Sequence, residues 1–125
     1  MFIILKDKTI CLTRGDAASI TITANQQDEQ PYTFRVGDVV RFRVFKRKDC
    51  ACVVIQKDVA VTEPVESVTV SLTKADTSIG DIISKPTDYW YEVELNPDSQ
   101  PQTIIGYDED GAKVFRLYPE GGDLV

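Results

Sequence analysis

Glu92 and Glu94 form the carboxylate pair whose spacing could support catalysis. Two residues apart on a strand, they would share one face, with roughly 7 Å between the bases of their side chains. Glycosidases hydrolyse sugar linkages with a carboxylate pair, but no cleft-forming motif surrounds these two, and a solvated strand face is the alternative. The chain has no histidine, which removes the commonest general base and the Ser-His and Cys-His nucleophile pairs. We therefore expect no catalytic residues and no enzymatic activity.

Metal and cofactor sites are not expected either. The run DEDG at 108–111 resembles the start of a calcium loop, but the later ligands of such a loop are lacking. A hairpin turn joining the last two strands is the better interpretation. The three cysteines, Cys11, Cys50 and Cys52, are an odd number and too few for a zinc site without histidine. No glycine-rich phosphate loop is present.

Five residues on two expected strands could form an interaction surface: Arg41, Arg43, Trp90, Glu92 and Glu94. Trp90 lies between two tyrosines that alternation places on the opposite face of its strand. An exposed tryptophan can anchor a sugar or a protein partner, and it can equally pack against the sheet. Both interpretations of Trp90 stay open from the sequence.

The tripeptide RGD at 14–16 matches an integrin-type adhesion signal. Three residues match by chance often, and the glycine also has a structural use, because Gly15 can turn the chain between the first strands. We regard the turn as the better interpretation.

Charge and hydrophobicity exclude two classes of partner. The net charge is −6 and the isoelectric point is about 4.6, whereas binding to phosphate backbones needs clustered lysine and arginine. The basic residues between 41 and 48 are outweighed by acid elsewhere. No stretch approaches about 18 apolar residues, the length of a membrane span. We therefore expect neither nucleic acid nor membrane as a partner.

Short runs of alternating apolar and polar residues dominate the chain, as is typical of half-buried antiparallel strands. Glycine, asparagine, aspartate and proline separate the runs. Thr73 and Asp76 form a weak capping box, which predicts one helical turn over 73–79 that crosses from one sheet to the other. We predict an all-β, antiparallel, immunoglobulin-like β-sandwich of about eight strands with this one short helical turn. The strands are expected at 19–23, 39–46, 52–57, 67–72, 89–95, 102–107 and 112–118, after at least one earlier strand.

One domain of 1–118 and a loose tail of 119–125 fit the chain length. Alternation also selects the side chains that face the core. The predicted core is Ile20, Ile22, Val40, Phe42, Val44, Val68, Val70, Leu72, Tyr91, Val93, Leu95 and Phe115.

The motifs, taken in order, resemble a known family. They are LTRGD at 12–16, FRVGDVVRF at 34–42, VSLTKADT at 70–77, YWYEVEL at 89–95, QTII at 102–105 and FRLYPE at 115–120. This order is similar to small immunoglobulin-like domains in phage and prophage tail proteins of Gram-positive bacteria. The N-terminal domain of baseplate upper proteins is the nearest named relative.

The resemblance implies a virion component that is assembled in the bacterial cytoplasm and works in the phage tail. It implies binding to other tail or baseplate proteins and a homo-oligomer, with no catalysis. Glu92 stands where aspartate is common in the family, and the stretch from 80 to 88 is longer. The alternative function is a β-sandwich that binds glycans or cell surfaces, with Trp90, Glu92 and Glu94 as its face.

Overall fold

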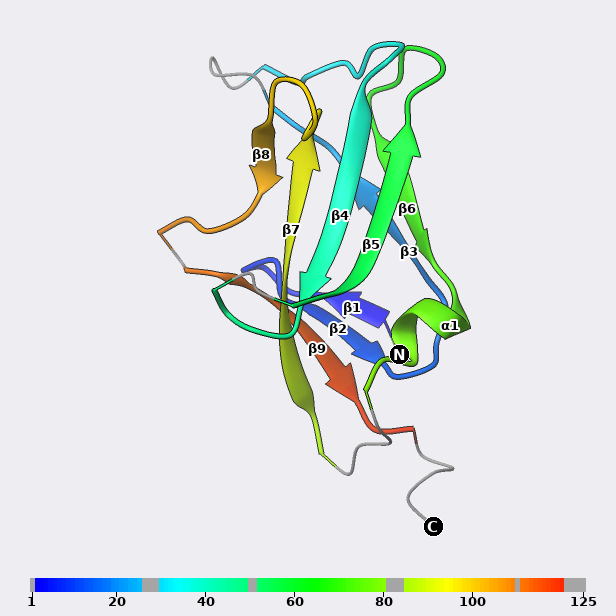
Figure 1. Cartoon of the computed structure of the whole chain (residues 1–125), viewed down its shortest axis with the longest axis vertical. Coiled ribbons are helices and arrows are strands. Elements are labelled where there is room, and N and C mark those ends of the chain that lie inside the picture. Colours follow the sequence, from blue (N-terminus) through cyan, green and yellow to red (C-terminus); the bar gives the residue numbers. More distant parts are fainter. Residues whose placement is uncertain (1, 26–29, 50–51, 81–84, 110, 121–125) are drawn as a thin grey trace.

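The computed structural model describes residues 2–25, 30–49, 52–80, 85–109 and 111–120. Within them the chain forms nine strands and one short helix (Figure 1). In chain order the elements are β1 (Phe2–Ile4), β2 (Ile10–Thr13), β3 (Ala18–Ile22), β4 (Val39–Phe45), β5 (Val53–Ala60), β6 (Val68–Leu72), α1 (Lys74–Thr77), β7 (Thr87–Leu95), β8 (Gln102–Ile105) and β9 (Lys113–Tyr118).

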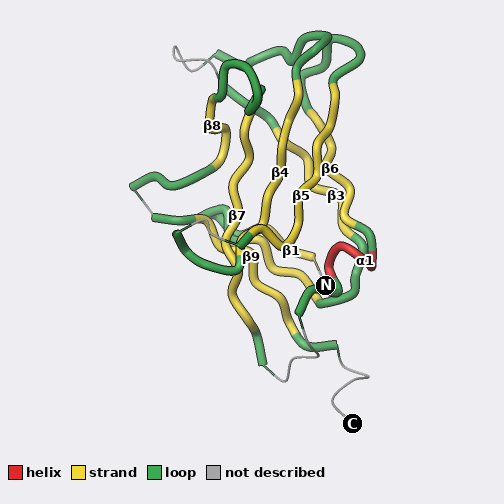
Figure 2. Tube along the Cα trace, viewed as in Figure 1, coloured by secondary structure: helices red, strands yellow, loops and turns green. Residues whose placement is uncertain are grey.

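The strands form two sheets that pack face to face. The larger sheet has the order β1-β2-β9-β7-β4-β5, with β8 also paired to β7, and the smaller sheet is β3-β6 (Figure 2). The predicted all-β sandwich is confirmed.

Two details of the pairing differ from the prediction. β2 and β9 run parallel, whereas all pairs were expected to be antiparallel. β8 and β9 were expected to form a hairpin, but both pair with β7, at Leu95 and Val93 for β8 and from Tyr91 to Thr87 for β9. They therefore lie one after the other along a single edge of β7. A tight turn does join Asp108 and Gly111, and Gly111 has the expected positive φ of 90°.

The sandwich interior contains every core residue that alternation predicted. All twelve are buried, with exposed fractions between 0 and 7%. At its centre, the ring of Phe42 lies 5.7 Å from that of Tyr91 and 6.3 Å from that of Phe115. The register of β4 and β7 is therefore correct, because a slip of one residue would have turned these side chains outward.

The helical turn has the predicted cap and crosses between the sheets. The amide of Asp76 donates to the Thr73 hydroxyl at 3.2 Å, and the amide of Thr73 donates to the Asp76 carboxylate at 2.8 Å. Lys57 on β5 binds the same carboxylate at 2.9 Å. Burial opposes the charge of Asp76, but these hydrogen bonds and Lys57 outweigh it and hold the pKa of this carboxyl below its usual value. The cap thus ties α1 to the larger sheet.

The predicted tail, 119–125, lies outside the described residues except for Pro119 and Glu120. The carboxylate of Glu120 accepts a hydrogen bond from Arg14 at 3.0 Å, and the looseness of the tail stays a prediction.

Candidate interaction surface

The five predicted surface residues meet on one face of the larger sheet. We call the side that faces β3 and β6 the inner face and the opposite side the outer face. β4 and β7 are neighbours, and their register places Arg43 opposite Glu92, Arg41 opposite Glu94, and Phe45 opposite Trp90. The register thus brings Trp90, Glu92, Glu94, Arg41 and Arg43 together on the outer face, and their role as an interaction surface stays a prediction.

Arg43 is shared by the two glutamates. Its Nη2 donates to Oε1 of Glu92 at 2.7 Å and also donates to Oε1 of Glu94. The guanidinium carbon lies 5.4 Å from the centroid of the Phe45 ring, within range of a cation–π contact. Nε of Arg43 is buried and has no hydrogen-bond partner among the described residues.

The proximity of the two carboxylates changes the acidity of Glu92. Partial burial, a hydrogen bond to Glu94 and repulsion by the Glu94 charge raise the pKa of Glu92, and Arg43 opposes this effect. Two carboxylates bound to one cation resist full ionisation. Arg43 binds both glutamates. The pair therefore does not present the unbound carboxylate and the separate carboxylic acid that glycoside hydrolysis uses.

The remaining arginines of the outer face are also neutralised within the chain. Arg41 binds Asp58 at 2.9 Å and Asp98 at 3.0 Å, and Arg116 binds Asp88 at 2.7 Å. Hydrogen bonds to these carboxylates raise the pKa of Arg41 and of Arg116. Because aspartates already neutralise Arg41 and Arg116, these arginines contribute little to binding a phosphate backbone.

Trp90 is only partly exposed. It lies between Phe45 on β4 and Val114 on β9, so its ring belongs to an apolar row across the outer face. The alternation that placed it opposite Tyr89 and Tyr91 is confirmed, since both tyrosines are buried at 8% and 4% exposure.

The hollows of the molecule lie elsewhere. A groove of about 1020 Å³ runs between β3 and β8, and a hollow of about 620 Å³ lies between Phe2 and β3. The groove is lined largely by neutral polar side chains, including Thr21, Asn25 and Gln102. Among the hollows found in the described part of the chain, none is lined by the five predicted residues.

Sequence reasoning missed the apolar edge strand β1. Phe2, Ile3, Ile4 and Leu5 are exposed at 38, 49, 45 and 45%, and β1 forms the outermost strand beside β2. Contiguous exposed apolar residues commonly mark interaction sites. The available signal was the unbroken apolar run at the start of the sequence, which lacks the alternation used to find the other strands.

The RGD tripeptide has an internal structural role. The guanidinium of Arg14 donates to the carbonyls of Ser78, Ile79 and Gly80 and to Glu120, at 2.9 to 3.2 Å. These bonds satisfy the backbone carbonyls of the three residues that follow α1. The side chain of Arg14 is only 13% exposed, so this arginine is bound within the fold instead of being displayed.

The remaining sequence candidates show no ligand cluster. No group of three or more histidine, cysteine, aspartate or glutamate residues with metal-binding geometry occurs in the described ranges. In the run DEDG at 108–111, for which the sequence favours a turn over a calcium loop, Asp108 binds the ammonium of Lys113 at 2.6 Å. Cys50 lies outside the described residues, and Cys52 precedes β5 in an exposed bend. Within the described chain, no helix has the length and apolar character needed to cross a membrane.

Comparison with known proteins adds no relative. The chain matches no protein-family model, no curated protein and no solved structure. The β-sandwich and the geometry of its surfaces therefore carry the functional argument, together with the motif resemblance.

Proposed function

We propose that the protein is a non-enzymatic structural module that binds other proteins in a phage or prophage tail. The single observation that carries the binding role is the exposed apolar strand β1. Its residues Phe2 to Ile4, together with Leu5 directly after it, are each at least 38% exposed at the edge of the larger sheet. Such an edge is costly for a protein that works alone, because it invites pairing with other chains.

The outer face supports a structural role instead of a catalytic one. Arg43 binds both Glu92 and Glu94, and Arg41 is held by two aspartates. Networks of this kind stabilise a sheet surface and fix its side chains. The assignment to a tail or baseplate, with a virion location and a homo-oligomer, comes from the order of sequence motifs.

The test is co-assembly with the proteins encoded beside its gene. We expect the purified chain to form a stable complex with at least one tail or baseplate product, or a homo-oligomer, in analytical ultracentrifugation. The double variant F2S/I4S should weaken that assembly. V36S is the matched control, since Val36 is also apolar and 66% exposed but lies away from β1. A chain that stays monomeric and binds none of these products would refute the proposal.

A second candidate, glycan binding, is favoured by one observation. The groove between β3 and β8 presents the neutral hydroxyl and amide groups of Thr21, Asn25 and Gln102, which suit sugar hydroxyls. We expect N25A/Q102A to abolish any signal on a glycan array, whereas W90A would do so if the outer face were the site. An array without signal for the unaltered chain removes this candidate.

A further inference from the structure

β1 is the one edge strand of the described chain that exposes only apolar side chains. It ends the larger sheet, and no described strand pairs with its outer side. Its residues Phe2, Ile3 and Ile4 are 38, 49 and 45% exposed. Each of the other edge strands exposes polar side chains: Ser19 and Thr21 on β3, Gln56 and Asp58 on β5, Thr69 and Ser71 on β6, and Gln102 and Thr103 on β8. Composition therefore distinguishes β1 from edges that are equally unpaired.

The backbone of β1 directs two of its three residues toward the free side. The amide of Leu5, directly after the strand, donates to the carbonyl of Thr9 at 2.9 Å. Hydrogen-bonded positions alternate along an antiparallel pair, so Ile3 is the residue of β1 that exchanges hydrogen bonds with β2. Phe2 and Ile4 therefore point their N–H and C=O groups outward, where an added strand can bind them.

These outward groups are self-complementary. When two copies of β1 run antiparallel about a twofold axis at Ile3, Phe2 of each copy lies opposite Ile4 of the other. Both members of each pair direct their N–H and C=O groups across the axis, so four backbone hydrogen bonds form. A register centred on Phe2 or on Ile4 forms only two among residues 2–4. The twofold axis at Ile3 therefore satisfies all the outward groups of β1.

The same register brings apolar side chains together on both faces. On the outer face, Ile3 meets Ile3 of the second copy. Phe2 and Ile4 lie on the inner face, because they pair with the buried Leu12 and Ile10, and there Phe2 meets Ile4 of the second copy. The hollow of about 620 Å³ borders Phe2 on this face. Pairing would remove these exposed side chains from water, which stabilises the association.

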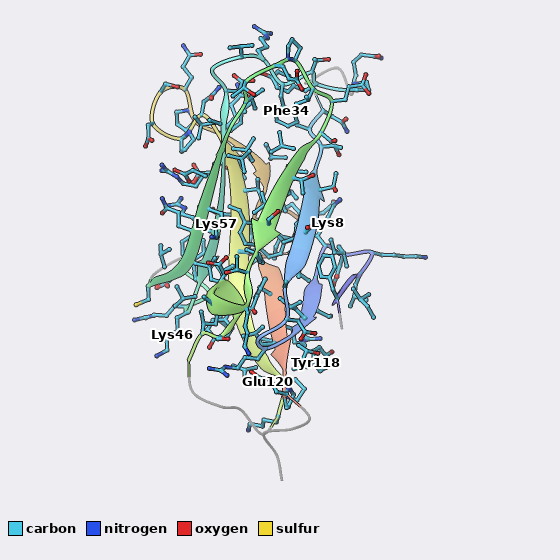
Figure 3. The ribbon with its side chains drawn as sticks, turned by 90° about the vertical axis from the view of Figure 1, so that its right-hand side faces the viewer. Lys8, Phe34, Lys46, Lys57, Tyr118 and Glu120 are labelled. Carbon is cyan, nitrogen blue, oxygen red and sulfur yellow. The ribbon has the colours of Figure 1, made fainter. Side chains whose placement is uncertain are left out.

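The lack of charge on β1 favours a second copy as the occupant. An acidic or basic strand would gain no ion pair there, so the added strand should be apolar on both faces. Among the strands of the described chain, β1 is the only one with that composition. The nearest charges in sequence, Lys6, Asp7 and Lys8, follow the paired segment and fall outside this register. Figure 3 shows Lys8 on the side of the molecule opposite Lys57 of β5, so this pairing leaves the other edge of the sheet free.

We propose that two copies of the chain pair through β1, antiparallel about a twofold axis at Ile3, and join their larger sheets into one continuous sheet. This inference rests on the proposed protein-binding function and names the partner of the exposed strand that carries it. Three-residue strands bury less than the roughly 800 Å² per partner of a standard interface, so the dimer alone is weak. Within a tail assembly, other contacts would hold the copies close and raise their effective concentration.

The test is self-association of the full chain at concentrations up to about 0.5 mM, as suits a small interface, followed by sedimentation equilibrium. NMR of a mixture of isotope-labelled and unlabelled chains locates the contact. We expect a nuclear Overhauser effect between the Hα protons of Ile3 in the two copies, because a non-hydrogen-bonded antiparallel pair brings its Cα atoms to about 4.5 Å. One chain has only one such proton, so the signal reports on the dimer alone.

Three variants test the side chains and the backbone separately. F2S/I4S should abolish the dimer. I4P keeps an apolar side chain but removes the outward N–H, which β2 does not use. The symmetric dimer then loses two hydrogen bonds, so its Kd should rise about tenfold. V53S is the matched control, since Val53 is 47% exposed on the edge strand β5, and its Kd should stay within about twofold of the unaltered chain.

The outcomes separate the dimer from the broader function. A chain that stays monomeric at this concentration, while tail proteins bind it through β1, would overturn the second-copy pairing and leave the proposed function standing. A dimer that I4P leaves intact, or that lacks the contact between the two Ile3 residues, would refute pairing through β1 in this register. If copies pair through β1 but no tail or baseplate protein binds the chain, the dimer stands and the tail assignment falls.

Discussion

The hydroxyl of Tyr32 donates a hydrogen bond of 2.7 Å to the carboxylate of Asp38. Asp38 is only 9% exposed and also accepts from the amides of Arg35 and Asn96 at 2.9 and 3.1 Å. Burial opposes its charge, but these hydrogen bonds prevail, so the pKa of Asp38 lies below its usual value. Gly37 precedes it with a φ of 95°, a conformation that favours glycine. The turn before β4 thus holds the carboxylate of Asp38 with three hydrogen-bond donors.

Replacing Tyr32 by phenylalanine should lower the free energy of unfolding by about 1 to 2 kcal/mol, because a buried acceptor loses its donor. The loss of that donor should also raise the pKa of Asp38. A depressed carboxyl pKa contributes stability that is present above the unfolded pKa and lost as the pH falls through the folded one. The acid-unfolding midpoint of Y32F, followed by circular dichroism, should therefore lie at higher pH. Y107F is the control, since Tyr107 is 81% exposed, and it should behave as the unaltered chain.

The sequence predicts the paired strands at the centre of the sandwich better than its edges. β4, β6 and β7 alternate regularly, so burial of Phe42, Val70 and Val93 follows from period two. β1 was missed because Phe2 to Ile4 are apolar on both faces and the strand lies at an edge. In such a strand no alternation marks an inward side.

The hairpin error has a different cause. The turn chemistry at Gly111 is local and was read correctly, but the partner of a strand is a property of the whole sheet. β7 is long enough to pair with β8 near Leu95 and with β9 near Tyr89, which leaves these two strands end to end. The contact between Arg43 and Glu92 depends on the whole sheet in the same way. Alternation predicts that both side chains lie on a polar strand face, but only the register of β4 against β7 shows that they touch.

Replacing Val70 by aspartate should prevent folding at room temperature. Val70 is fully buried on β6, and an unpaired buried carboxylate costs several kcal/mol, a large part of the stability of a small domain. T69D is the matched control, because Thr69 is the next residue on the same strand and faces solvent. Thermal denaturation should show a folded T69D and an unfolded V70D. A V70D variant as stable as the unaltered chain would contradict the register assigned to β6.

Replacing Arg14 by alanine should lower the free energy of unfolding by about 2 to 3 kcal/mol. The side chain serves three consecutive carbonyls after α1 and the Glu120 carboxylate, and unsatisfied partly buried acceptors are costly. R14K should recover only part of the loss, because lysine lacks the planar set of donors. R47A removes an arginine whose side chain is 66% exposed, and urea unfolding should leave it unchanged. An R14A variant as stable as R47A would show that the contacts of Arg14 contribute nothing.

The cluster of Arg43, Glu92 and Glu94 predicts a pH dependence of the opposite sign to that of Asp38. The pKa of Glu92 is raised in the folded state, so the folded state binds the proton more tightly than the unfolded one. A raised carboxyl pKa therefore lowers stability as the pH rises from about 4.5, its ordinary value, through the folded one. E92Q removes this effect, and its unfolding free energy at pH 7 should match or exceed that of the unaltered chain.

Replacing Arg43 by methionine should enlarge that pH dependence. Without the shared guanidinium, two neighbouring half-buried carboxylates repel each other, so R43M should lose about 1 to 3 kcal/mol at pH 7. Protonation relieves the repulsion, so the loss should be smaller near pH 5. The double variant R43M/E92Q should regain part of the stability at pH 7, because one charge of the repelling pair is gone. Urea titrations of the three variants at pH 5 and pH 7 measure these differences. If R43M loses the same stability at both pH values, the guanidinium contributes by packing on Phe45 and not by neutralising the two glutamates.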